Sequence, residues 1–303
     1  MPAAAERVEE ALDRAARGIA RADALVVTAG AGMGVDSGLP DFRGTEGFWR
    51  AYPPFARLGL RFEQAANPVH FARDPALAWG FYGHRLNLYR GTRPHEGFEL
   101  LGRWAESAPA GSFVFTSNVD GHFQRAGFPA GRVVECHGSI LHLQCSEPCS
   151  DDVWSAEGVD VAVDESTFRA RDPLPECPAC GAVARPNVLM FGDWLWLPGR
   201  TAAQEERFRR WLEGVSGRLA VVEVGAGTAV PTVRLTSEHL VAAHGAQGGE
   251  ALLVRVNPRE PEVPTGHVAV AMGGLEALRE IDRRLSGRAG RPGSAGGPAE
   301  AGG

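Results

Sequence analysis

A short apolar strand that runs into a glycine-rich turn constrains this chain more than any other feature. Residues 24–28 form an apolar run typical of a buried strand, and Gly30, Gly32 and Gly34 follow it. Glycines at the carboxyl end of a strand let the backbone approach a pyrophosphate, and the N–H groups of the next helix then face that group. Similar turns also close many ordinary strand–helix units. The pattern therefore predicts an α/β fold, and a phosphate-binding loop is one of its two interpretations.

Three later segments have the same continuous apolar character: residues 113–115, 219–224 and 252–256. Residues 5–20 carry apolar side chains at helical spacing. Continuous apolar strands between helical stretches indicate a parallel sheet covered on both faces. We therefore expect an α/β fold: a Rossmann-like parallel sheet with helices on both faces, a small zinc-binding module and a helical insertion.

The segments between these strands suggest how the chain is divided. Residues 45–100 hold aromatic and helical material, residues 140–190 contain four cysteines and little periodicity, and the last eighteen residues are rich in Gly, Pro and Ala. We expect residues 1–44, 101–139 and 191–285 to form a Rossmann-like domain and residues 45–100 to form a helical insertion. We expect residues 140–190 to form a zinc-binding module and residues 286–303 to form a disordered tail.

Four of the five cysteines form two close pairs, Cys145 with Cys149 and Cys177 with Cys180. In a reducing compartment such pairs indicate a metal site rather than disulfides. Four thiolates make a closed tetrahedral zinc site, whereas a catalytic zinc would need an open position. We expect a structural zinc ion, and we interpret the remaining Cys136 as a packing residue.

The net charge of −6 favours neither nucleic acid nor an anionic membrane surface as a partner. No apolar stretch approaches the roughly 20 residues that a membrane-spanning helix needs. We expect a cytoplasmic protein that binds no nucleic acid and no membrane. The sequence predicts no oligomeric state.

The glycine-rich turn continues without interruption into a longer motif, GAGMGVDSGLPDFRG (residues 30–44). Further motifs follow in order: TSNVD (116–120), ECHGS (135–139), the cysteine pairs, PNVLMFGD (186–193), VGAG (224–227) and VN (256–257). Together they resemble the sirtuins, NAD-dependent protein lysine deacylases, from about residue 20 to about residue 285. Several departures from the usual motifs indicate a divergent, bacterial-type member.

The resemblance implies that NAD is a consumed co-substrate. The acyl oxygen of an acylated lysine displaces nicotinamide, and the products are nicotinamide, O-acyl-ADP-ribose and deacylated lysine. His137 matches the general base, and a pKa near neutrality suits that role; without the other motifs it would be a strand-end histidine. Asn118 and Asp120 match the pair that holds the nicotinamide carboxamide. The residues implied in NAD binding are Gly30, Ala31, Gly32, Gly34, Asp41, Phe42, Arg43, Ser117, Asn118, Asp120, Gly225, Ala226, Gly227 and Asn257.

The resemblance also implies two substrate contacts. Val188, Met190, Phe191 and Gly192 match a stretch that pairs its backbone with the acylated peptide; from the residues alone it is an ordinary strand. Tyr82 and Arg85 share one face of a predicted helix, and some sirtuins use this spacing to bind the carboxylate of a succinyl or malonyl group. The other interpretation of Arg85 is a solvated side chain beside an aromatic core.

Departures from the family pattern leave the acceptor open. Gly34 and Ser117 stand where a serine and a glutamine are usual, and His122-Phe123 stands where Leu-His is usual. A protein ADP-ribosyltransferase or an NAD hydrolase on the same fold is therefore an alternative, and a non-catalytic NAD or ADP-ribose sensor is a further one. His137 argues against the sensor, because binding alone needs no base.

Overall fold

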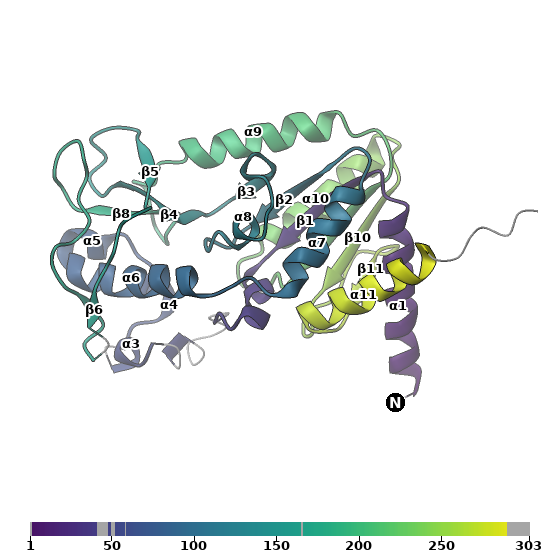
Figure 1. Ribbon diagram of the computed structural model, residues 1–303, viewed down its shortest axis with the longest axis horizontal. Coiled ribbons are helices and arrows are strands. Elements are labelled where there is room, and N and C mark those ends of the chain that lie inside the picture. The colour runs from purple at the N-terminus through teal and green to yellow at the C-terminus, as the bar shows by residue number, and fades with distance from the viewer. Residues whose placement is uncertain (1, 41–47, 50–51, 58, 165, 290–303) are drawn as a thin grey trace, which may run out of the picture.

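The computed structural model describes residues 2–40, 48–49, 52–57, 59–164 and 166–289. In this part of the chain the largest sheet is parallel and has six strands in the order β11-β10-β9-β1-β2-β3 (Figure 1). Its strands are β1 (Ala24–Ala29), β2 (Ser112–Thr116), β3 (Val133–Glu135), β9 (Leu219–Val224), β10 (Ala251–Val256) and β11 (Val268–Val270). The predicted strands and the parallel sheet are confirmed.

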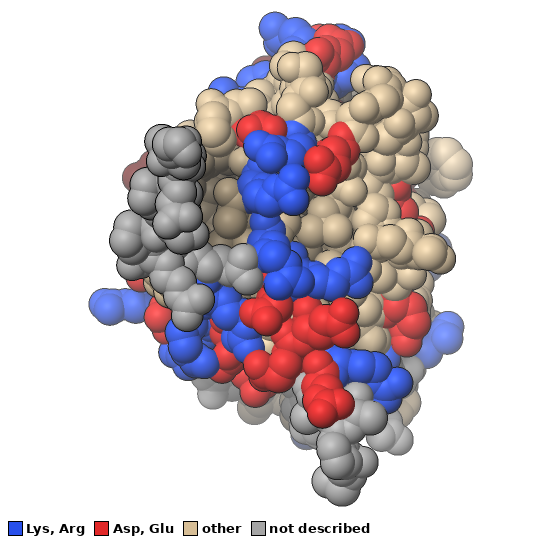
Figure 2. Space-filling view, turned by 90° about the vertical axis from the view of Figure 1, so that its right-hand side faces the viewer, with Lys and Arg blue, Asp and Glu red and all other residues tan. Residues whose placement is uncertain are grey.

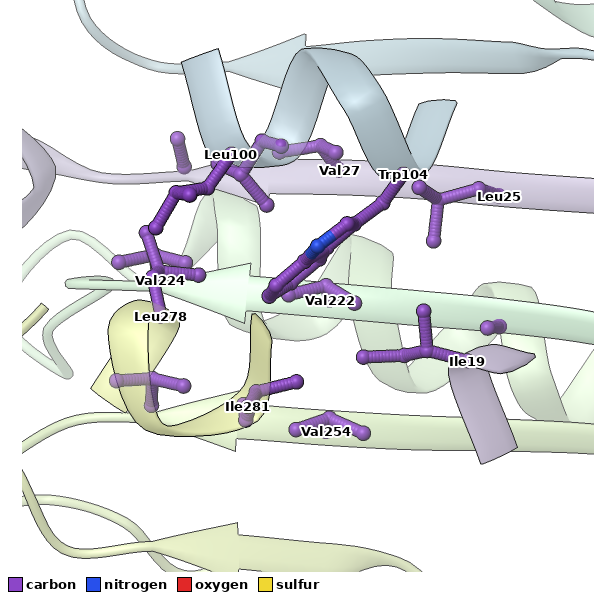
Figure 3. Packing of buried hydrophobic residues seen from close by; sticks show 14 of the residues in the cluster. Ile19, Leu25, Val27, Leu100, Trp104, Val222, Val224, Val254, Leu278 and Ile281 are labelled. Atoms are coloured by element: carbon purple, nitrogen blue, oxygen red, sulfur yellow. The ribbon is translucent and has the colours of Figure 1, made fainter. Parts of the chain in front are cut away.

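Helices cover both faces of this sheet, which explains why its strands are apolar without alternation. Leu25 and Val27 of β1 belong to one core cluster, whereas Ala24 and Val26 belong to the cluster on the opposite face. Figure 3 shows the first face, where side chains from three helices pack over β1, β9 and β10. These helices are α1 (Pro2–Ala20), α7 (Glu96–Ser107) and α11 (Gly274–Ala289), and those on the other face are α9 (Gly199–Glu213) and α10 (Thr232–Ala246).

A second lobe packs around its own core at the carboxyl ends of the parallel strands (Figure 1). It combines the antiparallel sheet β5-β4-β8 with short helices and a small hairpin. Its elements are α3 (Pro53–Arg57), α4 (Phe62–Ala65), α5 (Val69–Arg73), α6 (Pro75–Gly91), β4 (Gly138–Cys145), β5 (Val153–Ser155), β6 (Val163–Asp164), β7 (Arg169–Ala170) and β8 (Ala184–Val188). Of the remaining short elements, η1 (Ala31–Ser37) follows β1, whereas α8 (His122–Arg125) and η2 (Ala130–Arg132) lie between β2 and β3.

Gly80 permits the close packing of α6 in this lobe, and it gives a stability prediction. A Cβ at position 80 would lie 1.9 Å from the carbonyl oxygen of Phe168, whereas a Cβ on Gly91 of the same helix would meet nothing within 4 Å. We expect Gly80→Ala to lower the free energy of unfolding by about 1–3 kcal/mol or more, because the backbone must move. Gly91→Ala should be neutral or slightly stabilising. Denaturant unfolding of both variants tests this, and an equal effect at the two positions would contradict it.

The carboxyl-terminal helix differs from the sequence prediction. Helix α11 continues to Ala289, so residues 286–289 are helical and do not belong to the predicted tail. Leu285, the last residue before the predicted boundary, still packs partly buried against the core. Residues 290–303 lie outside the described part of the chain. The rest of the predicted division into domains stays a prediction.

The amino ends of the parallel strands form a separate face of the molecule. Arginine side chains gather there beside an acidic cluster (Figure 2). Arg14, Arg17 and Arg21 of α1, together with Arg218, line a shallow hollow of about 480 Å³ at the starts of β9 and β10. This face lies at the opposite edge of the sheet from the predicted motifs. Among the described residues, none of the helices combines the length and the hydropathy that crossing a membrane requires.

Candidate active site

A cavity of about 750 Å³ lies between the sheet and the second lobe. The segments that follow β1, β2, β3 and β9 form one side of it, because the carboxyl ends of parallel strands meet at one edge of a sheet. The second lobe contributes the segment after β8 and side chains of α4 and α6. The predicted residues that line it are Gly30, Ala31, Gly34, Tyr82, Arg85, Ser117, Asn118, Asp120, His137, Val188, Met190, Phe191, Gly225, Ala226 and Gly227. Motifs that are up to 197 residues apart (227 − 30) thus share one cavity. Its volume is in the range of small-molecule sites.

Two glycine loops touch each other at the floor of this cavity. The N–H of Gly32 donates to the carbonyl oxygen of Gly225 at 3.0 Å. Gly225 has a φ of +66°, and a Cβ there would lie 2.4 Å from the backbone of Gly32. The segment after β1 forms the 3-10 helix η1, and Gly38 ends it in the left-handed conformation. Glycine is therefore required where the two loops meet, and both backbones lie open to the cavity.

The segment after β2 is fixed by its own polar groups. The Asn118 side chain donates from Nδ2 to the carbonyl oxygen of Gly30 at 3.0 Å, which joins it to the first glycine loop. The Asp120 carboxylate accepts from the backbone N–H of His122 at 2.9 Å. Burial raises the pKa of Asp120, and the nearby His122 ring opposes that effect. An amide and a carboxyl group are thus held side by side along one wall.

His137 lies between β3 and β4, where the chain passes from the parallel sheet to the second lobe. Its ring lines the cavity and is partly buried, and burial lowers its pKa below the usual 6.5. The imidazole is therefore neutral near pH 7 and can accept a proton. His142, five residues further along, lies outside the cavity lining, and burial lowers its pKa to about 4.

Arg85 brings a buried positive charge into the same cavity. Its Nε and Nη2 atoms donate to the Tyr89 hydroxyl at 3.0 Å and 2.7 Å. Burial alone would lower the pKa of Arg85, but the hydroxyls of Tyr89, Tyr52 and Tyr82 outweigh it, and the guanidinium remains charged. Arg85 is 6% exposed and lies among aromatic rings, so it is not a solvated surface side chain. Tyr89 was not predicted, although its spacing of four from Arg85 on a helix is the spacing of side chains that share a face.

The stretch after β8 forms the other wall. Leu189 donates its N–H to the carbonyl oxygen of His137 at 2.9 Å, and Phe191 donates to that of Ala66 at 3.1 Å. Met190 donates to the Asp193 carboxylate at 3.3 Å. The backbone N–H groups of residues 189–191 are thus used within the protein. The lining residues Phe62 and Glu63 of α4 carried no sequence signal.

Three other predicted residues do not line the cavity. Gly32 joins the two glycine loops by its hydrogen bond to Gly225, and Gly192 is exposed at a turn with a φ of +69°. Asn257 is buried and donates from Nδ2 to the carbonyl oxygen of Ala226 at 2.9 Å, so it supports the second glycine loop. Asp41, Phe42 and Arg43 lie outside the described residues, and their role stays a prediction.

Comparisons with known proteins agree with this geometry. A family model described as the Sir2 family matches residues 30–208. The chain belongs to the Sir2 family. The predicted resemblance to the sirtuins is thereby confirmed. A protein named NAD-dependent protein deacylase from Aeropyrum pernix is 31% identical to this family member over 91% of this chain and 98% of that protein. One of the same name from Thermus thermophilus is 32% identical, over 90% and 93%.

Solved structures of Sir2 homologues share the fold of this family member. One described as a complex with NAD has a TM-score of 0.65 and 26% identity, and the match covers 91% of this chain and 94% of that one. Another, a mutant described in complex with ADP-ribose, has the same TM-score and identity over 91% and 97%. The likeness extends over both lobes.

The four paired cysteines of this Sir2 protein come together as predicted. The Sγ atoms of Cys145, Cys149, Cys177 and Cys180 all lie within 4.8 Å of one another. Cys145 and Cys180 are separated by 3.7 Å and Cys149 and Cys177 by 3.6 Å, close to the roughly 3.8 Å edge of a tetrahedron with zinc–sulfur bonds of about 2.3 Å. The cluster fits a structural zinc ion. Cys136 is buried apart from it, in the sheet core.

One departure from the family pattern falls outside the cavity of this Sir2 protein. His122 is fully buried, and its ring packs edge-on against Phe98 at a centroid distance of 5.7 Å. It does not line the cavity. Gly34 packs against Leu39, and Ser117 lines the cavity with a shorter side chain than glutamine.

Proposed function

We propose that this protein is an NAD-dependent protein lysine deacylase that produces nicotinamide, O-acyl-ADP-ribose and deacylated lysine. The observation that carries the proposal is one cavity shared by a neutral, partly buried His137, the Asn118–Asp120 pair and two touching glycine loops. Relatives named NAD-dependent protein deacylase, about 30% identical over most of the chain, support it. Its partners in the reaction are proteins with acylated lysine side chains.

Each group has a role that its surroundings support. When bound, NAD supplies nicotinamide as a leaving group and a ribose that takes up the acyl group. His137 accepts the proton of a ribose hydroxyl at a ring nitrogen, because burial keeps the ring neutral. Asn118 and Asp120 orient the nicotinamide carboxamide, which itself carries a donor and an acceptor. The backbone of Gly30, Ala31, Gly225 and Ala226 lies close enough for diphosphate and ribose contacts.

The peptide occupies the wall formed by residues 188–191. In this proposal the N–H groups of an extended substrate donate to alternate carbonyl oxygens of this stretch, in the manner of an added strand. The acyl-lysine side chain then enters the cavity beside Val188 and Met190, which are buried. This arrangement reads the substrate backbone and directs the acyl group toward His137.

A measurement of reaction products tests the proposal. The enzyme is incubated with NAD and with matched acetyl-lysine and succinyl-lysine peptides, and the products are identified by mass spectrometry. O-acyl-ADP-ribose together with deacylated peptide is expected. Release of nicotinamide with both peptides unchanged would instead indicate ADP-ribosyl transfer or NAD hydrolysis, and the deacylase proposal would be wrong.

Arg85 sets the expected acyl preference. A buried guanidinium that lines the cavity suits a carboxylate, and a charge-assisted hydrogen bond contributes about 1.5–3 kcal/mol. We therefore expect Arg85→Met to lower kcat/KM for succinyl-lysine by about 10- to 100-fold relative to acetyl-lysine. Arg93→Met makes the same chemical change at an exposed position outside the cavity and should leave the ratio unchanged. An unchanged ratio in Arg85→Met would show that Arg85 does not read the acyl group.

A further inference from the structure

Four large apolar side chains are exposed on the peptide wall, residues 188–191, and on the short segment that follows it. Trp194 is 95% exposed, and Leu189, Phe191 and Leu195 are 38%, 39% and 52% exposed. Leu189 and Phe191 alternate with the buried Val188 and Met190, as expected for extended chain whose successive side chains point to opposite sides. We call these four exposed residues the apolar rim. Large apolar side chains rarely stay exposed together on one short segment unless the segment is an interaction site.

A buried ion pair holds the segment that carries the rim. The side chains of Arg185 and Asp193 form a salt bridge and are 1% and 0% exposed. The Asp193 carboxylate also accepts from the N–H groups of Met190 and Leu195, at 3.3 Å and 3.2 Å. The turn between Phe191 and Leu195 is therefore fixed by one carboxylate, and it holds Trp194 out in solvent.

Two buried amides complete this support. Gln144 donates from Nε2 to the carbonyl oxygen of Leu195 at 2.8 Å and accepts from the N–H of Leu197 at 3.1 Å. Asn187 donates to Gln144 and to the carbonyl oxygen of Leu197, both at 2.9 Å. A preorganised segment loses little conformational entropy when a ligand binds. Buried polar groups thus fix the segment in a conformation that leaves its apolar side chains exposed.

The apolar rim continues directly from the cavity. Leu189 and Phe191 belong to the rim and also line the cavity, and the Phe191 ring packs edge-on against Phe62 at 5.9 Å. Trp194 and Leu195 follow Phe191 within four residues along the chain and are exposed, although they do not line the cavity. A chain that lies along residues 188–191 with its acyl-lysine in the cavity would place neighbouring side chains over the rim.

We propose that the apolar rim recognises an apolar side chain, aliphatic or aromatic, close to the acyl-lysine in the sequence of the substrate protein. This inference rests on the proposed deacylase function and adds a side-chain specificity to it. Backbone contacts along residues 188–191 do not depend on the side chains of the substrate. The apolar rim, in contrast, distinguishes substrates by the apolar side-chain surface that they bury against it. Trp194 provides the largest contact, because its ring is almost entirely exposed before the substrate binds.

Peptides that differ only beside the acyl-lysine test this specificity. One peptide carries serine at the three positions on each side of the acyl-lysine, and six others each replace one serine with leucine. Acetyl and succinyl series are assayed with NAD for kcat and KM. Leucine at one or two positions should lower KM about five- to tenfold, the order expected for partial burial of one aliphatic side chain, without changing kcat.

Two variants assign any preference to the rim. Trp194→Ser should abolish the leucine advantage, whereas Leu235→Ser, on α10 and 59% exposed outside the rim, should retain it. Thermal unfolding confirms that both variants fold. Deacylation of all peptides with equal KM, or an advantage that survives Trp194→Ser, would overturn the rim as a recognition surface and leave the deacylase function standing. Absence of deacylation with every peptide would overturn the proposed function itself, and the inference with it.

Discussion

Replacing His137 with alanine should reduce the deacylation of acyl-lysine peptides by about 100- to 10,000-fold, the usual contribution of a positioned general base. The imidazole lines the cavity and is held neutral by burial, so its loss removes the proton acceptor. The expected loss lies in kcat, because the side chain acts on the transition state rather than on binding. Product formation with saturating NAD and peptide measures it.

His142→Ala is the matched control for this variant. Its ring is also a buried imidazole with a lowered pKa, but it lies outside the cavity lining and should leave kcat within about twofold, as remote substitutions usually do. NAD binding by calorimetry should persist in both variants. Full activity in His137→Ala with intact binding would remove the residue from the chemistry.

The burial of His137 also predicts how activity declines at low pH. Since burial lowers the pKa of His137 below 6.5, the midpoint of the protonation of its ring lies below pH 6.5. Activity limited by His137 should therefore decline on the acid side with a midpoint below pH 6.5. A decline centred above pH 6.5 would contradict this sign of the shift.

The sequence predicts those parts of the fold and site that depend on local pattern. Continuous apolar runs identify β1, β2, β9 and β10, and the cysteine spacing identifies the metal cluster, because each signal lies within a few residues. It did not predict that Glu223 and Arg255, inside two of these strands, form a buried ion pair at 2.5 Å. That contact depends on strand neighbours 32 residues apart, which no local pattern reveals.

Side chains that converge from different elements were also hard to predict. Tyr89 holds Arg85 from one turn further along α6, and its role depends on which face of that helix meets the cavity. The contact of Asn257 with the cofactor stays a prediction, and the sequence did not indicate that its side chain donates to the carbonyl group of Ala226. Family motifs thus indicate which segments meet, whereas the partner of each polar atom follows from packing.

Replacing Cys177 with serine should remove the zinc ion and unfold the module around it. Four thiolates within 4.8 Å of one another fit a structural site, and such sites contribute about 10 kcal/mol or more in small zinc peptides. We expect loss of about one bound zinc per chain by elemental analysis and a clear fall in the midpoint of thermal unfolding. Cys136→Ala changes a buried cysteine outside the cluster and should keep the zinc.

Loss of the zinc ion should also disturb the cavity, although no cysteine lines it. Strand β4 begins directly after His137 and ends at Cys145, and its antiparallel partner β8 begins four residues after Cys180 and ends at the cavity residue Val188. The zinc cluster thus fixes the far ends of two strands whose near ends carry the proposed base and the peptide wall. Deacylation should fall together with the zinc content during chelation and return when zinc is restored before unfolding. Full activity in fully zinc-free protein would show that β4 and β8 hold the site without the metal.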